Sequence, residues 1–312
     1  MLLVSSASAS VKIVHRSQTS GLTGVGDFDT KSTEHYNGTM RRTESVTNVS
    51  GGVVGFFSKK DQTETSITRL DKGVIWTLKP DDKEYKEQSL DEIAKQMRSM
   101  REESDAPRKN EDVHYRYDVK VETPADRLTI AGYDARHTRI LVTVIEENTK
   151  EKTSKESSYL TYDLWLADGG KGVQQEVLAF SKAYMDRIGI TGDVSSNPMV
   201  AKSMAQFGGM MTEATAKLKG MDGLPVKTIM LIETPGGTDQ SASSHEDQGP
   251  PTSIGGMLGG MFGGGSKEKE APPKEGTPGR RVAMKITDEV LEVATAPLAA
   301  DLFEIPAGWS KD

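Results

Sequence analysis

Short segments in which apolar and polar residues alternate one by one recur along most of the chain. In the segment GVIWTLKP, Val74, Trp76 and Leu78 fall on one side of the chain. Thr77 and Lys79 fall on the other side. A period of two residues is typical of a β-strand with one buried face. Further strands are predicted by the same reasoning within residues 11–71, 113–121, 133–146, 158–168, 223–233 and 282–293.

Three segments change to the three- and four-residue spacing of an amphipathic helix. The first runs from Leu90 to Met100, and Ser89 and Glu92 form a capping box at its start. The second runs from Val173 to Ile188, and the third from Met199 to Leu218. The sequence therefore predicts an α+β fold in which strands far outnumber helices.

The stretch at residues 236–280 consists mainly of Gly, Ser, Pro and charged residues. Such a composition buries too little apolar surface to offset its ordering entropy, so we expect a disordered insert within a hairpin. Met257, Leu258, Met261 and Phe262 recur among its glycines. They either contact a partner or belong to a flexible spacer, and the density of glycine favours the spacer.

The first nine residues, MLLVSSASA, join a short apolar stub to Ala7-Ser8-Ala9, which fits the small-residue rule for signal-peptide cleavage. We interpret residues 1–9 as a residual signal peptide and expect a periplasmic or secreted protein; a frayed N-terminus is the alternative. The chain contains no cysteine. Disulfides, cysteine-based zinc sites and the lipid-bearing cysteine of a bacterial lipoprotein are therefore excluded.

The charge pattern and the polar residues restrict the function further. The formal net charge is −7, with no basic block suited to a phosphate backbone, so we expect no nucleic-acid partner. No run approaches the roughly 18 apolar residues of a membrane span, so an integral membrane protein is not expected. The five histidines stand far apart, and no nucleophile motif is present. We therefore expect no enzyme, no metal site and no cofactor.

Four segments resemble, in the same order, parts of the LolA/LolB-like lipoprotein-carrier superfamily, and most closely its uncharacterised bacterial relatives. They are Thr68 to Tyr85 (TRLDKGVIWTLKPDDKEY), Tyr162 to Gly169 (YDLWLADG), Gly223 to Val226 (GLPV) and Leu298 to Trp309 (LAADLFEIPAGW). The resemblance implies a curved antiparallel β half-barrel that wraps two or three helices and can hold acyl chains. Residues 10–235 and 281–312 would then form a single LolA-like domain.

The leading hypothesis is a non-catalytic envelope protein that binds a lipid or other apolar ligand in the half-barrel cavity. Methionine-rich helices support it, because thioether side chains adapt to varied apolar shapes. The large aromatic residues either line the cavity or fill the core, and core filling is their commoner role. The candidate cavity residues are Trp76, Leu78, Met97, Leu164, Trp165, Phe180, Tyr184, Met204, Phe207 and Met211.

The alternative hypothesis is a structural or protein-interaction module with a core filled by its own side chains. In that case the glycine- and methionine-rich insert would contact an envelope protein. A sensor domain of the same fold is a third interpretation. The expected partner is therefore a lipid or acyl ligand in the first case and a protein in the second.

Overall fold

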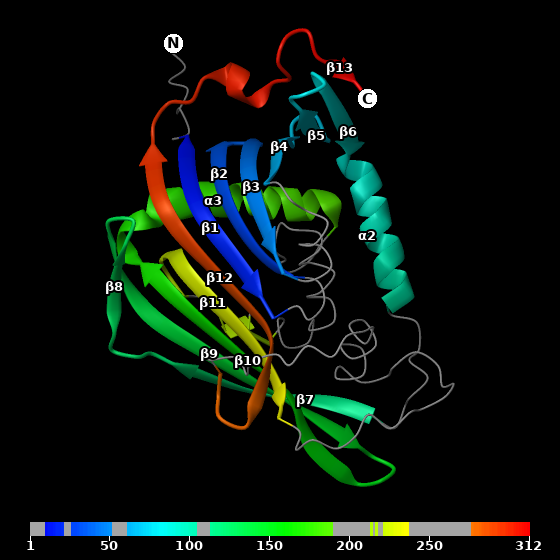
Figure 1. Ribbon diagram of the computed structural model, residues 1–312, viewed down its shortest axis with the longest axis vertical. Coiled ribbons are helices and arrows are strands. Elements are labelled where there is room, and N and C mark those ends of the chain that lie inside the picture. The colour runs from blue at the N-terminus through cyan, green and yellow to red at the C-terminus, as the bar shows by residue number, and fades with distance from the viewer. Residues whose placement is uncertain are drawn as a thin grey trace, which may run out of the picture.

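The computed structural model describes residues 10–21, 26–51, 61–104, 113–189, 213–214, 216–217, 221–236 and 276–312, with the backbone alone at 100–104. These residues form one sheet of 13 strands (Figure 1). The strands are β1 (Val11–Ser20), β2 (Asp27–Asn37), β3 (Met40–Ser50), β4 (Gln62–Arg69), β5 (Val74–Lys79), β6 (Glu84–Ser89), β7 (Val113–Glu122), β8 (Arg127–Ile130), β9 (Tyr133–Asn148), β10 (Thr153–Ala167), β11 (Leu224–Pro235), β12 (Arg280–Thr295) and β13 (Ser310–Lys311).

The strand order is β13-β6-β5-β4-β3-β2-β1-β12-β11-β10-β9-β7, and β8 also pairs with β9. All neighbours are antiparallel except β13 and β6, which are parallel. The sheet is joined at its centre by a long-range pairing, because β1 lies between β2 and β12, with Val11 opposite Thr295. The first and last parts of the chain thus share one sheet.

The helices are α2 (Leu90–Ser104), α3 (Lys171–Ile188) and two short 3-10 helices, η1 (Asp168–Gly170) and η2 (Ala300–Phe303). At the start of α2, the hydroxyl of Ser89 accepts a hydrogen bond of 3.2 Å from the backbone N–H of Asp91. The C-terminal end of α3 is closed by Gly189, whose φ of 72° suits a residue without a Cβ atom. The helices predicted at 90–100 and 173–188 are therefore confirmed.

The predicted half-barrel is wrong. The described strands form a large, open, mixed sheet, and only α2 and α3 are long helices in that part of the chain. Figure 1 shows α3 crossing behind the strands and α2 continuing from β6 at one side of the sheet, so the sheet does not wrap the helices. The sheet stays open because the β1–β12 pairing joins the strands other than β8 into one path whose two ends, β13 and β7, do not pair with each other.

Three further predictions fall largely on residues outside the described ranges. They are the residual signal peptide at 1–9, most of the helix at 199–218 and most of the insert at 236–280. Within the helix segment, Glu213, Ala214, Ala216 and Lys217 are described and are helical. In the described ranges, no helix is both long and apolar enough to cross a membrane.

Buried apolar side chains form four clusters. In the α3 cluster, Phe180 meets Tyr36 of β2 edge-on, with ring centroids 5.5 Å apart. The β9–β12 cluster lies on the strands β9, β10, β11 and β12. The C-terminal cluster packs Phe303 of η2 against β4 and β5. The helix–helix cluster joins Leu90 of α2 to Ile188 of α3.

Candidate functional site

The predicted cavity residues are distributed over all four clusters. Trp76 and Leu78 belong to the C-terminal cluster, and Leu164 belongs to the β9–β12 cluster. Trp165 and Phe180 belong to the α3 cluster. Neighbouring residues of a strand point to opposite faces, so Leu164 and Trp165 do not face a common space. These five side chains therefore do not surround one cavity.

The other cavity candidates do not change this picture. Met97 packs against the helix–helix cluster, and Tyr184 packs against both that cluster and the α3 cluster. Met204, Phe207 and Met211 lie outside the described residues. Of the ten candidates, the structure thus brings together only small groups that also serve the core.

Trp76 is a predicted cavity residue that packs within the core. Its side chain is 6% exposed, and its ring N–H donates a 2.9 Å hydrogen bond to Oε2 of Glu87. Its ring meets that of Tyr85 edge-on, with centroids 6.5 Å apart. A buried tryptophan whose polar atom is also satisfied is held as part of the core.

One end of the sheet, which we call the loop end, gathers the ends of five strands. Here Ser20 of β1 lies opposite Lys285 of β12, and Asp27 of β2 lies opposite Ser50 of β3. The β11–β12 pair also ends here, where Pro235 of β11 lies opposite Arg280 of β12.

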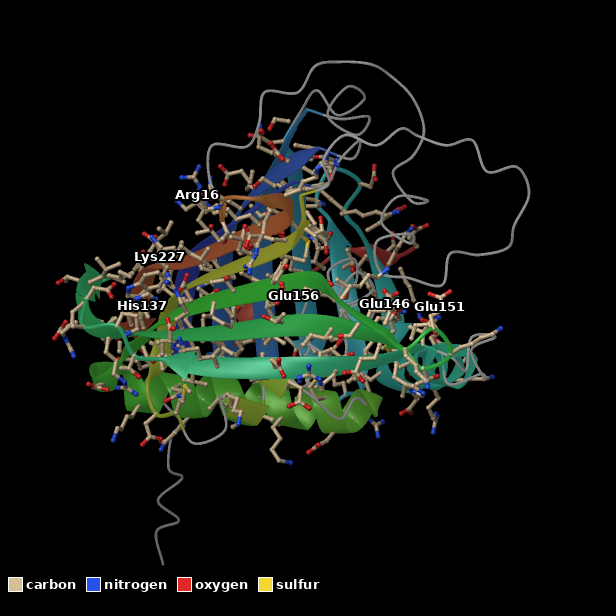
Figure 2. All side chains as sticks on the ribbon, turned by 90° about the horizontal axis from the view of Figure 1, so that it is seen from below. Arg16, His137, Glu146, Glu151, Glu156 and Lys227 are labelled. Atoms are coloured by element: carbon tan, nitrogen blue, oxygen red, sulfur yellow. The ribbon has the colours of Figure 1, made fainter. Side chains whose placement is uncertain are left out.

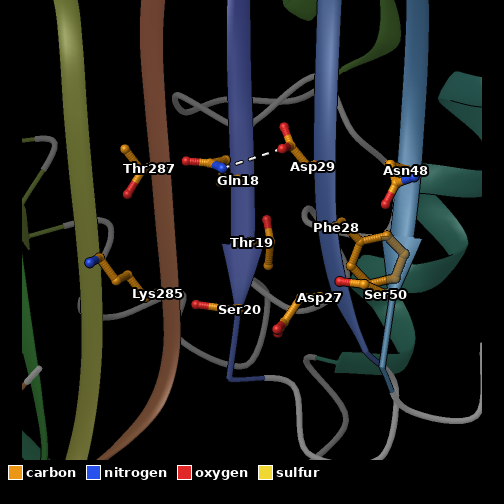
Figure 3. A pocket seen from close by; sticks show the side chains of 10 residues that line it. All are labelled: Gln18, Thr19, Ser20, Asp27, Phe28, Asp29, Asn48, Ser50, Lys285 and Thr287. Carbon is orange, nitrogen blue, oxygen red and sulfur yellow. Dashed lines mark hydrogen bonds between the residues drawn. The ribbon is translucent and has the colours of Figure 1, made fainter. Parts of the chain in front are cut away.

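A hollow of about 330 Å³ opens at the loop end (Figure 3). Ligand pockets begin at about 300 Å³, so its size is that of a small binding site. It combines hydroxyl, amide, carboxylate and ammonium groups with one aromatic ring. The lining residues are Gln18, Thr19, Ser20, Asp27, Phe28, Asp29, Asn48, Ser50, Lys285 and Thr287.

Asp29 is held in place within the hollow. The guanidinium of Arg16 donates two hydrogen bonds to its carboxylate, one of them 2.7 Å long from Nε, and the Gln18 amide donates another at 3.3 Å. The hydrogen bonds from Arg16 lower the pKa of Asp29 below its ordinary value. The Asp29 carboxylate is therefore ionised and paired with Arg16, and Lys285 on β12, the strand beyond β1, adds an ammonium group to the hollow.

Glu233 anchors the two ends of the insert at the loop end. It is 1% exposed and accepts hydrogen bonds of 2.7 Å from the backbone N–H of Thr277 and 3.0 Å from its hydroxyl. The guanidinium of Arg280 lies 3.6 Å from the same carboxylate. The backbone N–H of Gly236 also donates to the carbonyl of Gly279 at 2.9 Å. The insert thus leaves and rejoins the sheet at one fixed point.

A row of cross-strand neighbours runs across the sheet on the face of the hollow. The row has one residue on each successive strand from β1 to β9, each opposite the next: Arg16, Glu289, Lys227, Trp165 and His137. Figure 2 shows the first, third and last of them in this order. The row is bound together by a 2.6 Å ion pair between Lys227 and Glu289. This face of the sheet is therefore polar well beyond the hollow.

His137 ends the row in a hydrogen-bonded cluster, in which His137 and Asp163 are buried. Its ring nitrogens lie 2.9 Å from a carboxylate oxygen of Asp126 and 2.7 Å from one of Asp163. Asp163 also accepts a 2.6 Å hydrogen bond from Nε of Arg139. All these groups satisfy each other, which is the pattern of a structural network. In the described part of the chain, no group of His, Cys, Asp or Glu side chains is arranged to hold a metal ion.

Sequence reasoning missed the hollow and the His137 cluster. The residues of both are polar positions in alternating strands, and such positions are ordinarily solvated. The sequence signal was the presence of glycines near several strand ends, which does not reveal the order of the strands in the sheet.

No model of a known protein family matches the chain, and no curated protein matches its sequence.

Proposed function

We propose that the chain is a non-catalytic protein-interaction module of the cell envelope that binds its partner at the loop end. The observation that carries the proposal is that the hollow and the anchored base of the insert lie at the same end of the sheet. Loops held by a rigid scaffold are the usual place for binding residues.

The chemistry of the hollow supports a polar partner. Hydroxyl and amide groups both donate and accept hydrogen bonds, and the Arg16–Asp29 ion pair and Lys285 add charged groups. Such groups select a partner by complementary hydrogen bonds and charges more than by apolar contact. The separation of the apolar side chains into distinct clusters also favours the interaction module over the lipid-binding protein. Lipid binding stays a prediction, because three of its candidate residues lie outside the described ranges.

Site-specific photo-crosslinking tests the proposal. A photoreactive residue replaces Asn48 at the hollow, and in a matched chain it replaces Asn37, which ends β2 at the opposite end of the sheet. In the native host, we expect one discrete protein adduct from position 48 and none from position 37. Adding Lys285→Glu should weaken the adduct. Equal adducts from both positions, or none from either, would contradict the proposal.

A second measurement separates protein binding from lipid binding. Native mass spectrometry of protein purified from its own host records any copurified ligand. A stoichiometric acyl ligand together with no adduct at position 48 would favour the lipid-binding hypothesis. A ligand-free protein that forms the adduct is the result expected here.

A further inference from the structure

The strand β7 forms a border of the sheet. It pairs with β9 along its whole length of ten residues, from Val113 opposite Asn148 to Glu122 opposite Arg139. The path of paired strands ends there, so in the described part of the chain no strand pairs with its outer edge (Figure 1). A border strand presents unpaired backbone N–H and C=O groups that another strand can bind.

The exposed face of β7 carries charges of alternating sign. Arg116, Asp118, Lys120 and Glu122 follow one another at every second position. Their side chains are 52%, 57%, 71% and 34% exposed, respectively. Charges on a border strand normally oppose pairing with another strand, unless that strand offers the opposite charges at the same positions.

In one register, a second copy of β7 places an opposite charge against all four of these residues. When two copies pair antiparallel around a two-fold axis at Val119, Asp118 faces Lys120 of the partner subunit. In the same register, Arg116 faces Glu122 of the partner subunit. Symmetry repeats each pair, so four pairs of opposite charge result.

The two neighbouring registers are unfavourable. With the axis at Asp118, this residue faces its own copy, and Arg116 faces Lys120 of the partner subunit. With the axis at Lys120, the lysine faces its own copy, and Asp118 faces Glu122 of the partner subunit. Like charges directly opposite each other destabilise a strand pair. The charge pattern of β7 therefore favours the register centred on Val119, which pairs all four charges, over axes at Tyr117 or Val121, which pair only two of them.

We propose that the chain forms a symmetric dimer in which two β7 strands pair antiparallel around Val119. The dimer continues the sheet across the two-fold axis and satisfies the outer backbone groups of both strands. It also covers Val121, an apolar side chain that is 39% exposed, with Tyr117 of the partner subunit. This interface does not depend on the loop end, so the dimer and the proposed function stand or fall separately.

Sedimentation velocity of the full chain, with and without exchanged charges at positions 116 and 122, measures dimer formation and tests the interface. We expect the unsubstituted chain to be a dimer. Arg116→Glu places two pairs of like charge at the interface and should weaken the dimer by about 30-fold, and Glu122→Arg should do the same. The double variant restores opposite charges and should recover the dimer. Thermal unfolding of each variant checks that these exposed substitutions leave the fold intact.

Disulfide trapping tests the register in a chain that contains no cysteine. Val119→Cys places the two thiols opposite each other at the axis, so mild oxidation should give a covalent dimer. Val113→Cys is the matched control, because its two thiols would be about 40 Å apart along the strands. A monomer at every concentration, single variants without effect, a double variant without recovery, or equal trapping at both positions would overturn the proposal.

Discussion

His137 and Trp165 stack face to face, with ring centroids 4.4 Å apart and an angle of 8° between the ring planes. They are direct cross-strand neighbours on β9 and β10. Asp163, two residues before Trp165, contacts the same histidine at 2.7 Å. The two strands are therefore joined by a stacked pair and a charged contact in addition to their backbone hydrogen bonds.

Asp163→Asn should destabilise the protein by about 1 to 3 kcal/mol, because it leaves buried groups with a weaker acceptor. Asp163 has a side chain that is 11% exposed. The matched control is Asp168→Asn, whose side chain is 62% exposed and pairs with Arg136. This exposed pair should contribute less than about 1 kcal/mol. Urea denaturation measures both changes, and equal effects would show that the buried network contributes no more than the surface pair.

Trp76→Ala should lower the free energy of unfolding by about 3 to 5 kcal/mol, because it empties a large volume in the C-terminal cluster. Glu87→Gln keeps the tryptophan but weakens its hydrogen-bond acceptor and removes the exposed ion pair with Lys311, so its cost should be about 1 kcal/mol. Chemical denaturation of both variants checks this order. A small loss of stability in Trp76→Ala together with a loss of lipid binding would instead place Trp76 at a ligand site.

The elements that follow from local spacing were predicted well from the sequence. The alternation of Val74, Trp76 and Leu78 predicted β5, and the apolar spacing after Val173 predicted α3. Both patterns depend on residues that are close in the chain and face one core. For this reason they hold whatever the sheet order is.

The order of the strands could not be predicted in the same way. The pairing of Val11 with Thr295 joins opposite ends of the chain, and neither strand carries a signal for its neighbour. The resemblance to half-barrel proteins implied a curved sheet that wraps the helices, and the structure contradicts that architecture. The candidate cavity residues were chosen in the same way, since apolar residues such as Leu164 and Trp165 were grouped without knowledge of the face on which each lies.

Removing residues 238–274 should leave the sheet intact, because the hydrogen bond between Gly236 and Gly279 already closes the hairpin. Shortening a loop about tenfold lowers the entropic cost of bringing its two ends together, which should stabilise the fold by up to about 2 kcal/mol. The shortened chain keeps Thr277, the hydrogen-bond donor to Glu233. Urea denaturation compares the two chains. Unfolding of the shortened chain would mean that the insert contributes to the core.

His15 should give the protein a stability that falls as the pH rises. Burial alone lowers the pKa of His15, but the hydrogen bond with Asp288 and the charge of Glu34 outweigh both burial and the nearby Arg41. The pKa is therefore raised above its ordinary value of 6.5, and the folded state favours the imidazolium. This contribution is fully present below about pH 6.5 and is lost as the pH rises through the folded value.

His35 provides a control of opposite sign, because burial lowers its pKa. Its contribution is present above the unfolded value of about 6.5 and is lost as the pH falls toward the folded value. His15→Gln should therefore flatten the decline in unfolding free energy above about pH 6.5, whereas His35→Gln should flatten the decline below it. Urea denaturation from about pH 5 to about pH 9 measures both slopes. If His15→Gln left the slope above neutral pH unchanged, the contact with Asp288 would not stabilise the charged ring.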